Sequence, residues 1–130
     1  MIPRLAVDTN AVVAWFRSGN GEPRPLRDAG HLALLLPVIG ELYFGAFTSR
    51  KRDANVALLE EFIAQHRVVN ADETTARLYG QLRARPRLDN IRTSKMNDLW
   101  IAALCIQHDL PLLTNDRGFD TIDGLNVIHW

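Results

Sequence analysis

Four acidic residues occupy positions where a carboxylate can do chemistry: Asp8, Glu41, Asp98 and Asp116. Two follow short apolar runs typical of strands, and two lie in or at the start of apolar helices. Converging carboxylates repel one another, and burial also disfavours their charged forms. A divalent cation is the natural counter-charge, and an oxygen-only site suits Mg²⁺ or Mn²⁺ better than Zn²⁺. We expect Asp8, Asp98 and Asp116 to hold the metal, with Glu41 as a ligand or water-orienting base.

Polar residues with short side chains flank two of these acids. Thr9 and Asn10 follow the first acid, while Thr114 and Asn115 precede the last. Hydroxyl and amide groups in such places orient metal-binding carboxylates or bound waters. Mg²⁺ keeps several waters when it binds to protein, so this kind of site can hold a water or hydroxide for attack on a phosphodiester. The pattern therefore favours metal-assisted hydrolysis of phosphodiesters.

Short apolar runs predict the strands that place the acids. Leu5–Val7, Leu32–Leu36 and Leu112–Leu113 alternate with longer segments of helical periodicity, which is typical of an α/β fold. In an open parallel sheet, strand ends and the starts of the following helices converge on one edge, where ligands bind. The segment from Leu99 to Ile106 is apolar throughout and predicts a helix buried on nearly all sides. We therefore expect the acids to meet at one edge of a sheet.

Each acid taken alone has a simpler structural interpretation. Asp8, Asn97 or Asp98 can cap a helix, because Asp and Asn side chains accept hydrogen bonds from the free N–H groups of a first turn. Glu41 can be a solvated helix residue, since Glu is common at exposed helix positions. The sequence leaves these alternatives open at each position. What favours a shared site is that acids recur in four comparable places.

The composition is that of one globular domain spanning residues 1–130. Hydrophobic residues make up 47% of the chain and the formal net charge is zero. A neutral balance disfavours a dedicated nucleic-acid-binding module but still allows an enzyme that contacts phosphates over a small patch. The single cysteine, Cys105, rules out an internal disulfide and is expected to be a small buried hydrophobic residue. Without a secretory leader or a membrane-length apolar run, the protein is expected to be soluble and cytoplasmic.

The most basic stretch, residues 83–95, leads into the helix that carries Asp98. Lys and Arg supply most protein contacts to nucleic-acid phosphates, so Arg92 and Lys95 are candidate substrate contacts. A charge run of this kind is equally typical of a solvated loop. The four histidines are scattered and lack the spacing of a ligand set, so we assign them no site.

Four motifs together resemble a known family. They are Val7–Asn10, Pro37–Ala46, Asn97–Ala103 and Leu113–Asp116, the last followed by Phe119. In this combination they resemble the PIN-domain ribonucleases, and more closely the VapC-type toxins of toxin–antitoxin modules. The similarity runs nearly end to end, including the closing segment from Gly124 to Val127.

The resemblance implies a PIN-like three-layer fold, with a central parallel sheet of four to five strands flanked by helices. It implies Mg²⁺- or Mn²⁺-dependent endonucleolytic cleavage of RNA by an enzyme that is often a homodimer. It also implies an antitoxin protein whose C-terminal tail blocks the acidic pocket. By position, Asp8, Glu41, Asp98 and Asp116 match the acids of the family, and either Asn115 or Asp116 faces the metal at the fourth position.

Two other classes of protein remain as alternatives. An aspartate-based phosphatase would use Asp8 as its nucleophile, but such enzymes usually carry a second acid two residues later, where this chain has Asn10. A non-catalytic interaction domain is compatible with the neutral charge. It would, however, keep four carboxylates that lower stability without an evident gain.

Overall fold

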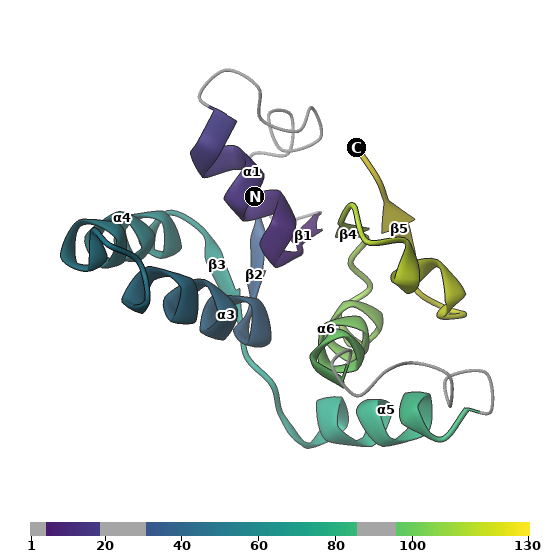
Figure 1. Cartoon of the computed structure of the whole chain (residues 1–130). Coiled ribbons are helices and arrows are strands. Elements are labelled where there is room, and N and C mark those ends of the chain that lie inside the picture. Colours follow the sequence, from purple (N-terminus) through teal and green to yellow (C-terminus); the bar gives the residue numbers. More distant parts are fainter. Residues whose placement is uncertain (1–4, 19–30, 86–95) are drawn as a thin grey trace.

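A five-stranded parallel sheet lies at the centre of the computed structural model, which describes residues 5–18, 31–85 and 96–130 (Figure 1). The strand order is β3-β2-β1-β4-β5. The strands are β1 (Ala6–Val7), β2 (Ala33–Leu35), β3 (Arg67–Val69), β4 (Leu112–Leu113) and β5 (Val127–Ile128). The predicted parallel sheet flanked by helices is therefore confirmed.

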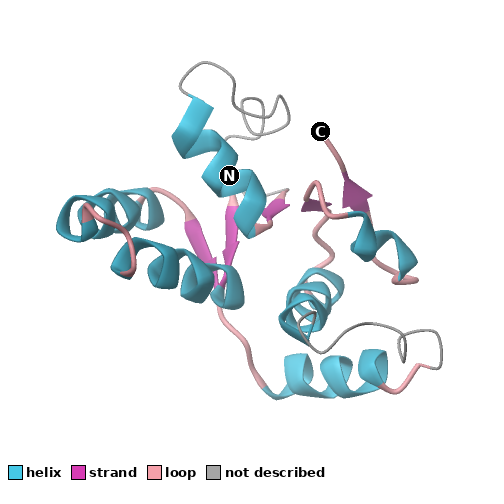
Figure 2. Cartoon of the chain, viewed as in Figure 1, coloured by secondary structure: helices cyan, strands magenta, loops and turns pink. Residues whose placement is uncertain are grey.

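Helices alternate with the strands, as Figure 2 shows. They are α1 (Thr9–Ser18), α3 (Leu36–Phe47), α4 (Arg52–Ala64), α5 (Glu73–Arg83), α6 (Met96–Gln107) and the short 3₁₀ helix η3 (Arg117–Thr121). The sequence predicts a helix from Glu73 to Arg83 with Asp72 as its cap, and the structure confirms both ends. After Asp116 the sequence indicates only a turn, whereas the structure forms η3. That helix starts where the Asp116 carboxylate accepts a hydrogen bond from the Gly118 amide at 2.8 Å.

Apolar residues bury the middle of the sheet on both faces. β1 pairs with β2 on one side and β4 on the other, and the side chains of all three strands are fully buried. Strands covered on both faces read as continuous apolar runs, which is why two or three residues of each suffice to predict them. In α6, the residues from Ile101 to Cys105 are also buried, as their composition predicted.

The register of β1 and β4 decides which residues meet beyond the strand ends. Val7 lies opposite Leu113 in the parallel pair. The residues that follow these two strands, Asp8 and Thr114, therefore lie at the same level just past the C-terminal ends of the strands. Both side chains are buried there.

Helix α3 begins directly where β2 ends, with Leu36 following Leu35. Pro37 occupies the first turn, where a missing N–H leaves no hydrogen bond unmade. This short connection holds the N-terminal half of α3 beside the same sheet edge. Helix α3 also contacts α1, α4 and α6, so it joins the elements on both sides of the site.

Helices α5 and α6 pack against each other along α6, from Trp100 near its start to Gln107 at its end. The Gln107 amide donates to the Asp72 carboxylate at 2.9 Å, and the rings of Tyr79 and Trp100 stack with centroids 4.1 Å apart. Across the described ranges, no helix has both the length and the apolar character needed to cross a membrane.

Candidate active site

Asp8 is the most enclosed acid of the site, with 6% of its surface exposed. Its carboxylate accepts hydrogen bonds from the Thr9 backbone amide at 2.8 Å, the Thr114 hydroxyl at 2.7 Å and the Asn10 side-chain amide at 3.3 Å. The backbone bond lies at the start of α1, so the predicted capping role is present. It coexists with the deeper contacts to Thr114 and Asn10, which a cap alone does not need.

Burial raises the pKa of Asp8 above its ordinary value of 3.8, because an ionised carboxylate is poorly solvated there. Hydrogen bonds from Thr114 and Thr9 act in the opposite direction. The negative charges of Glu41 and Asp116 then raise the pKa further. Three of the four predicted acids are thus close enough to interact electrostatically, as the convergence of strand ends predicts.

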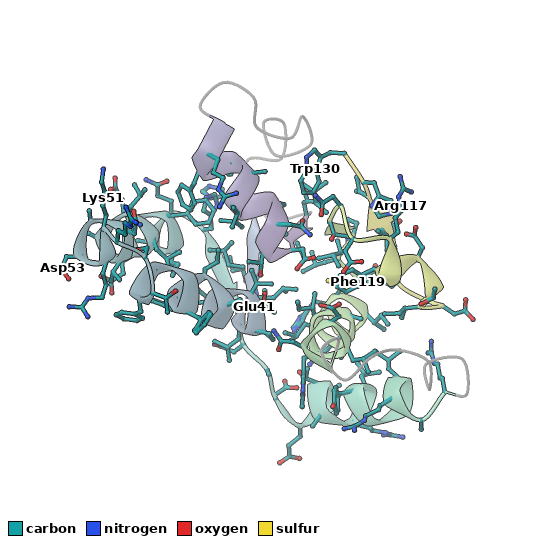
Figure 3. All side chains as sticks on the ribbon, in the orientation of Figure 1. Glu41, Lys51, Asp53, Arg117, Phe119 and Trp130 are labelled. Atoms are coloured by element: carbon teal, nitrogen blue, oxygen red, sulfur yellow. The ribbon has the colours of Figure 1, made fainter. Side chains whose placement is uncertain are left out.

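Glu41, in the second turn of α3, connects two other helices. One carboxylate oxygen accepts a hydrogen bond from the Thr9 hydroxyl at 2.7 Å, and the other accepts from the side-chain amide of Asn97. Thr9 begins α1 and Asn97 lies in the first turn of α6. A carboxylate at the N-termini of two helices is favoured by their dipoles. In Figure 3, Glu41 lies at the centre of the molecule, where α3 comes close to α6.

The Thr114 side chain is fully buried and joins the two strand ends. Its hydroxyl donates to Asp8 and accepts from the Asn10 amide at 3.2 Å and from the Asp116 backbone amide at 3.0 Å. The side-chain oxygen of Asn10, Oδ1, accepts a hydrogen bond from the Asn115 backbone amide at 3.3 Å. A hydroxyl and an amide thus hold the carboxylate of the central acid in one orientation.

Asp116 and Asn115 have different environments. The Asn115 side chain is exposed, and only its backbone amide reaches the network. Asp116 is half-buried, caps η3 and adds its negative charge to the field at Asp8. Asp116, and not Asn115, is therefore the residue whose charge raises the pKa of Asp8.

Asp98 lies in the first turn of α6 and is half-buried. Because the helix begins at Met96, neither Asn97 nor Asp98 is the residue that precedes the helix, and the capping interpretation of both is wrong. Within residues 5–18, 31–85 and 96–130, no three Asp, Glu, His or Cys side chains form a ready-made metal-ligand group. The convergence is therefore established for Asp8 with Glu41 and for Asp8 with Asp116, while the metal-ligand roles of Asp8, Asp98 and Asp116 all stay predictions.

A groove of about 370 Å³ opens beside Glu41, between α1, α3 and α4. Thr9 and Glu41 line its end at the acids, and Ser49 and Asn55 line the far end. Its body is mostly apolar, and it includes the exposed ring of Phe16. The acid cluster is thus continuous with a mostly apolar groove, through Thr9 and Glu41.

Two contributors to the site were not assigned a role there from the sequence. The side-chain amide of Asn97 donates to Glu41. Its position next to Asp98 was the signal in the sequence that it lies near the acids. His129 contacts the Thr114 carbonyl, but it lies 15 residues further along the chain and only the pairing of β4 with β5 brings them together. The candidate substrate contacts Arg92 and Lys95 lie outside the described residues.

Cys105 is buried in α6, and burial together with the nearby charge of Asp8 raises the pKa of its thiol to about 12. A thiol with such a pKa stays protonated at neutral pH and is a poor nucleophile. The prediction that it is a small buried hydrophobic residue is confirmed.

An acid-lined edge on a parallel sheet, with β3-β2-β1-β4-β5 order and helices between the strands, defines an α/β protein with a carboxylate site at its strand ends. The PIN domain family model matches residues 5–125, and the chain belongs to that family. It is 30% identical over 95 residues to Ribonuclease VapC5 of Mycobacterium tuberculosis, covering 72% of this chain and 70% of that protein.

Solved structures show the same fold. VapBC2 of Rickettsia felis, solved bound to a DNA fragment from its promoter, superposes with a TM-score of 0.85, at 24% identity over 97% of this chain and 98% of that chain. VapBC-5 of Mycobacterium tuberculosis, a member of the VapBC family of toxin–antitoxin systems, superposes with a TM-score of 0.73. Its identity is 24%, over 98% of this chain and all of that chain.

Proposed function

We propose that this chain is a metal-dependent endoribonuclease of the VapC type, the toxin of a toxin–antitoxin pair. The observation that carries the proposal is the buried carboxylate of Asp8, which interacts electrostatically with Glu41 and Asp116 at a sheet edge of a PIN-family chain. The ribonuclease name of the relative in Mycobacterium tuberculosis supports RNA as the substrate. Such an enzyme would act on intracellular RNA, so we expect it in the cytoplasm.

The donor set fits Mg²⁺ or Mn²⁺. Asp8, Asp98 and Asp116 offer carboxylate oxygens, and the hydroxyl of Thr114 and the amide of Asn10 orient the first of them. Hard divalent cations prefer such oxygen ligands. The raised pKa of Asp8 supports a cation as well, because burial, and then the charges of Glu41 and Asp116, disfavour the ionised carboxylate, which a bound cation would favour. A bound cation would supply an acidified water and neutralise charge on the phosphate.

The chain's own residues would then orient the reacting groups. Glu41, held by Thr9 and Asn97, would act as a metal ligand or as the base that orients the attacking water. Thr114 and Asn10 keep the Asp8 carboxylate fixed, so the enzyme does not have to reorder it during the reaction. The products are one RNA end with a phosphate and one with a hydroxyl.

RNA cleavage by purified protein tests this proposal. A panel of total RNA and structured RNAs is incubated with Mn²⁺, Mg²⁺ or EDTA, and Asp98→Asn is purified and tested in parallel. We expect cleavage that needs both the cation and Asp98. Cleavage that is indifferent to Asp98 would contradict the assigned site, and folded protein that cleaves none of the RNAs with either cation would contradict the activity.

The groove between α1, α3 and α4 supports an antitoxin as partner. An apolar channel that ends at Thr9 and Glu41 fits an amphipathic peptide carrying a basic residue toward the acids. The toxin–antitoxin description of the VapBC-5 complex agrees with such a partner. Co-expression with the protein encoded next to this gene, followed by cleavage assays of the complex, tests it. Bound partner should abolish cleavage, and Gly45→Trp in the groove should weaken the complex without changing cleavage by the free enzyme.

A homodimer is also proposed. On α3, the large apolar side chains of Leu36, Phe44 and Phe47 are exposed, and Phe44 is 72% exposed. Monomeric proteins rarely expose several large apolar side chains together on one helix. Sedimentation of the parent and of Phe44→Glu measures the oligomeric state, and the variant should sediment as a monomer.

A further inference from the structure

His129, just after β5, lies behind the acid edge with its imidazole between two oxygen atoms. Its Nδ1 is 2.7 Å from the carbonyl oxygen of Thr114, and its Nε2 is 2.8 Å from a carboxylate oxygen of Asp120. The side chain is 18% exposed. The Thr114 carbonyl oxygen can only accept a hydrogen bond, so Nδ1 is the donor in that contact.

These two contacts link His129 to both ends of the segment from Thr114 to Asp120. The segment runs from Thr114, which holds Asp8, through Asp116 and η3 to Asp120. Its first residue pairs with β5 through the bond from the Thr114 amide to the Ile128 carbonyl, and pairing stops there. The Thr114 carbonyl lies beyond the ladder and is satisfied by the His129 ring, as a buried backbone acceptor requires.

The orientation of Thr114 matters because its hydroxyl serves three groups. It donates to Asp8 and accepts from Asn10 and from the Asp116 amide. A rotation of the Thr114 peptide would shift all three contacts at once. A hydrogen bond on its carbonyl oxygen would limit that rotation.

We propose that His129 is a positioning residue for the acid edge, and that its Nδ1–H bond to the Thr114 carbonyl keeps the Thr114 hydroxyl directed at Asp8. The inference rests on the proposed nuclease function for its kinetic consequence, but its structural content stands apart from activity. Arg117, which pairs with Asp120 at 3.8 Å, holds the other end of the bridge.

Three substitutions separate the two bonds. His129→Phe keeps the ring shape and removes both hydrogen bonds. His129→Asn places an amide nitrogen at the Nδ1 position, so it keeps the bond to the Thr114 carbonyl and loses the one to Asp120. Asp120→Ala removes the second bond together with the ion pair to Arg117, and leaves the bond to Thr114. The matched control is His31→Phe, since His31 makes a similar Nδ1 contact to the Gln65 carbonyl at 3.2 Å, away from the acids.

Supporting partners of metal ligands change affinity or activity by roughly 10- to 100-fold when removed. We expect His129→Phe to lower kcat about tenfold with KM for an RNA oligonucleotide unchanged within about twofold. His129→Asn should restore most of that loss, and His31→Phe should match the parent. Equal losses in His129→Asn and His129→Phe, or no loss in either, would overturn the proposal.

Two measurements do not depend on cleavage. ¹⁵N spectra of the imidazole should show a proton on Nδ1 of His129 in the parent, and a changed environment of Nε2 in Asp120→Ala. Amide hydrogen exchange at Thr114 and Asp116 should be faster in His129→Phe than in His129→Asn. If the parent cuts no RNA, the nuclease proposal fails, while these two measurements still decide the role of His129.

Should His129→Phe fail to fold, His129→Asn and Asp120→Ala carry the test. The former should keep parental exchange at Thr114, and the latter should keep it within about threefold, because the Thr114 bond survives in both. Fast exchange at Thr114 in folded His129→Asn would show that the Nδ1 bond does not position this segment.

Discussion

Two neighbouring strands are followed by the same three residue types in rotated order. After β1 the chain reads Asp8, Thr9, Asn10, and after β4 it reads Thr114, Asn115, Asp116. Their register pairs Val7 with Leu113, so the acid of the first triplet lies beside the threonine of the second. Asp8 becomes buried and holds the centre of a hydrogen-bond network, whereas the acid of the second triplet is half-buried and caps η3.

The difference shows that distance from the strand end decides the role of each acid. A carboxylate immediately after a central strand lies between neighbouring strands and is desolvated, so its pKa rises. A carboxylate two residues later has left the sheet and meets the free N–H groups of the next helix. The following predictions test this contrast.

The largest expected contrast is in activity. Asp8→Asn should lower the rate of RNA cleavage by about 100-fold or more, because it removes a central ligand together with its charge. Asp116→Asn should lower it by about 10-fold, since that acid is more peripheral. Rates are measured under single-turnover conditions with saturating Mn²⁺. Equal losses in both variants would show that the two acids are equivalent despite their different burial.

Cation binding should reverse the stability cost of the buried acid. At a free Mn²⁺ concentration of 100 times the dissociation constant, binding adds about 2.7 kcal/mol to the free energy of unfolding of the parent. Asp8→Asn should gain much less at the same concentration. Thermal melts with and without Mn²⁺ measure both, and Ca²⁺ serves as a comparison cation. A shift of the melting temperature that is the same in parent and Asp8→Asn would place the cation elsewhere.

The threonine between the strands should matter more for stability than the acid beside η3. Thr114→Val leaves the Asp8 carboxylate without one buried donor, which should cost about 1–3 kcal/mol in urea denaturation. Thr114→Ser keeps the hydroxyl and is the matched control, with a smaller loss from its missing methyl group. A Thr114→Val protein as stable as the Ser variant would mean that the 2.7 Å bond contributes nothing.

The cap of η3 should have a smaller effect. Asp116→Ala removes the acceptor of the Gly118 amide and should cost about 1 kcal/mol, the usual value for a lost N-terminal cap. Asp116→Asn keeps an acceptor and should cost a few tenths of that. The same urea experiment measures both. An Asp116→Asn variant as unstable as Asp116→Ala would show that the charge of Asp116 contributes more to stability than its capping hydrogen bond.

The difference in stability between the parent and Asp8→Asn should depend on pH through the raised pKa of Asp8. Its pKa is higher in the folded than in the unfolded protein, so the folded state binds that proton more tightly. The resulting stabilisation is present below pH 3.8 and is lost as the pH rises through the folded pKa. Without divalent cations, Asp8→Asn should therefore gain stability relative to the parent as the pH increases across this interval. An unchanging difference would contradict the raised pKa.

Local patterns in the sequence account for most of the secondary structure. The apolar strands needed only composition, because strands buried on both faces lack alternation. Asp72 and the periodic residues after it fixed α5 at both ends. The 3₁₀ helix after β4 was not predicted from the sequence. Its five residues are too few to show a periodic pattern, and its start depends on a single side-chain hydrogen bond to Asp116.

By itself, the sequence determined which residue types stand at the strand ends and helix starts, and hence the class of fold and the chemistry of oxygen ligands. Tertiary structure decided which of them meet. The Val7–Leu113 register brought Thr114 to Asp8, and the pairing of β4 with β5 brought His129 to the Thr114 carbonyl. Contacts between residues about a hundred positions apart depend on register and crossover geometry, which no local pattern encodes.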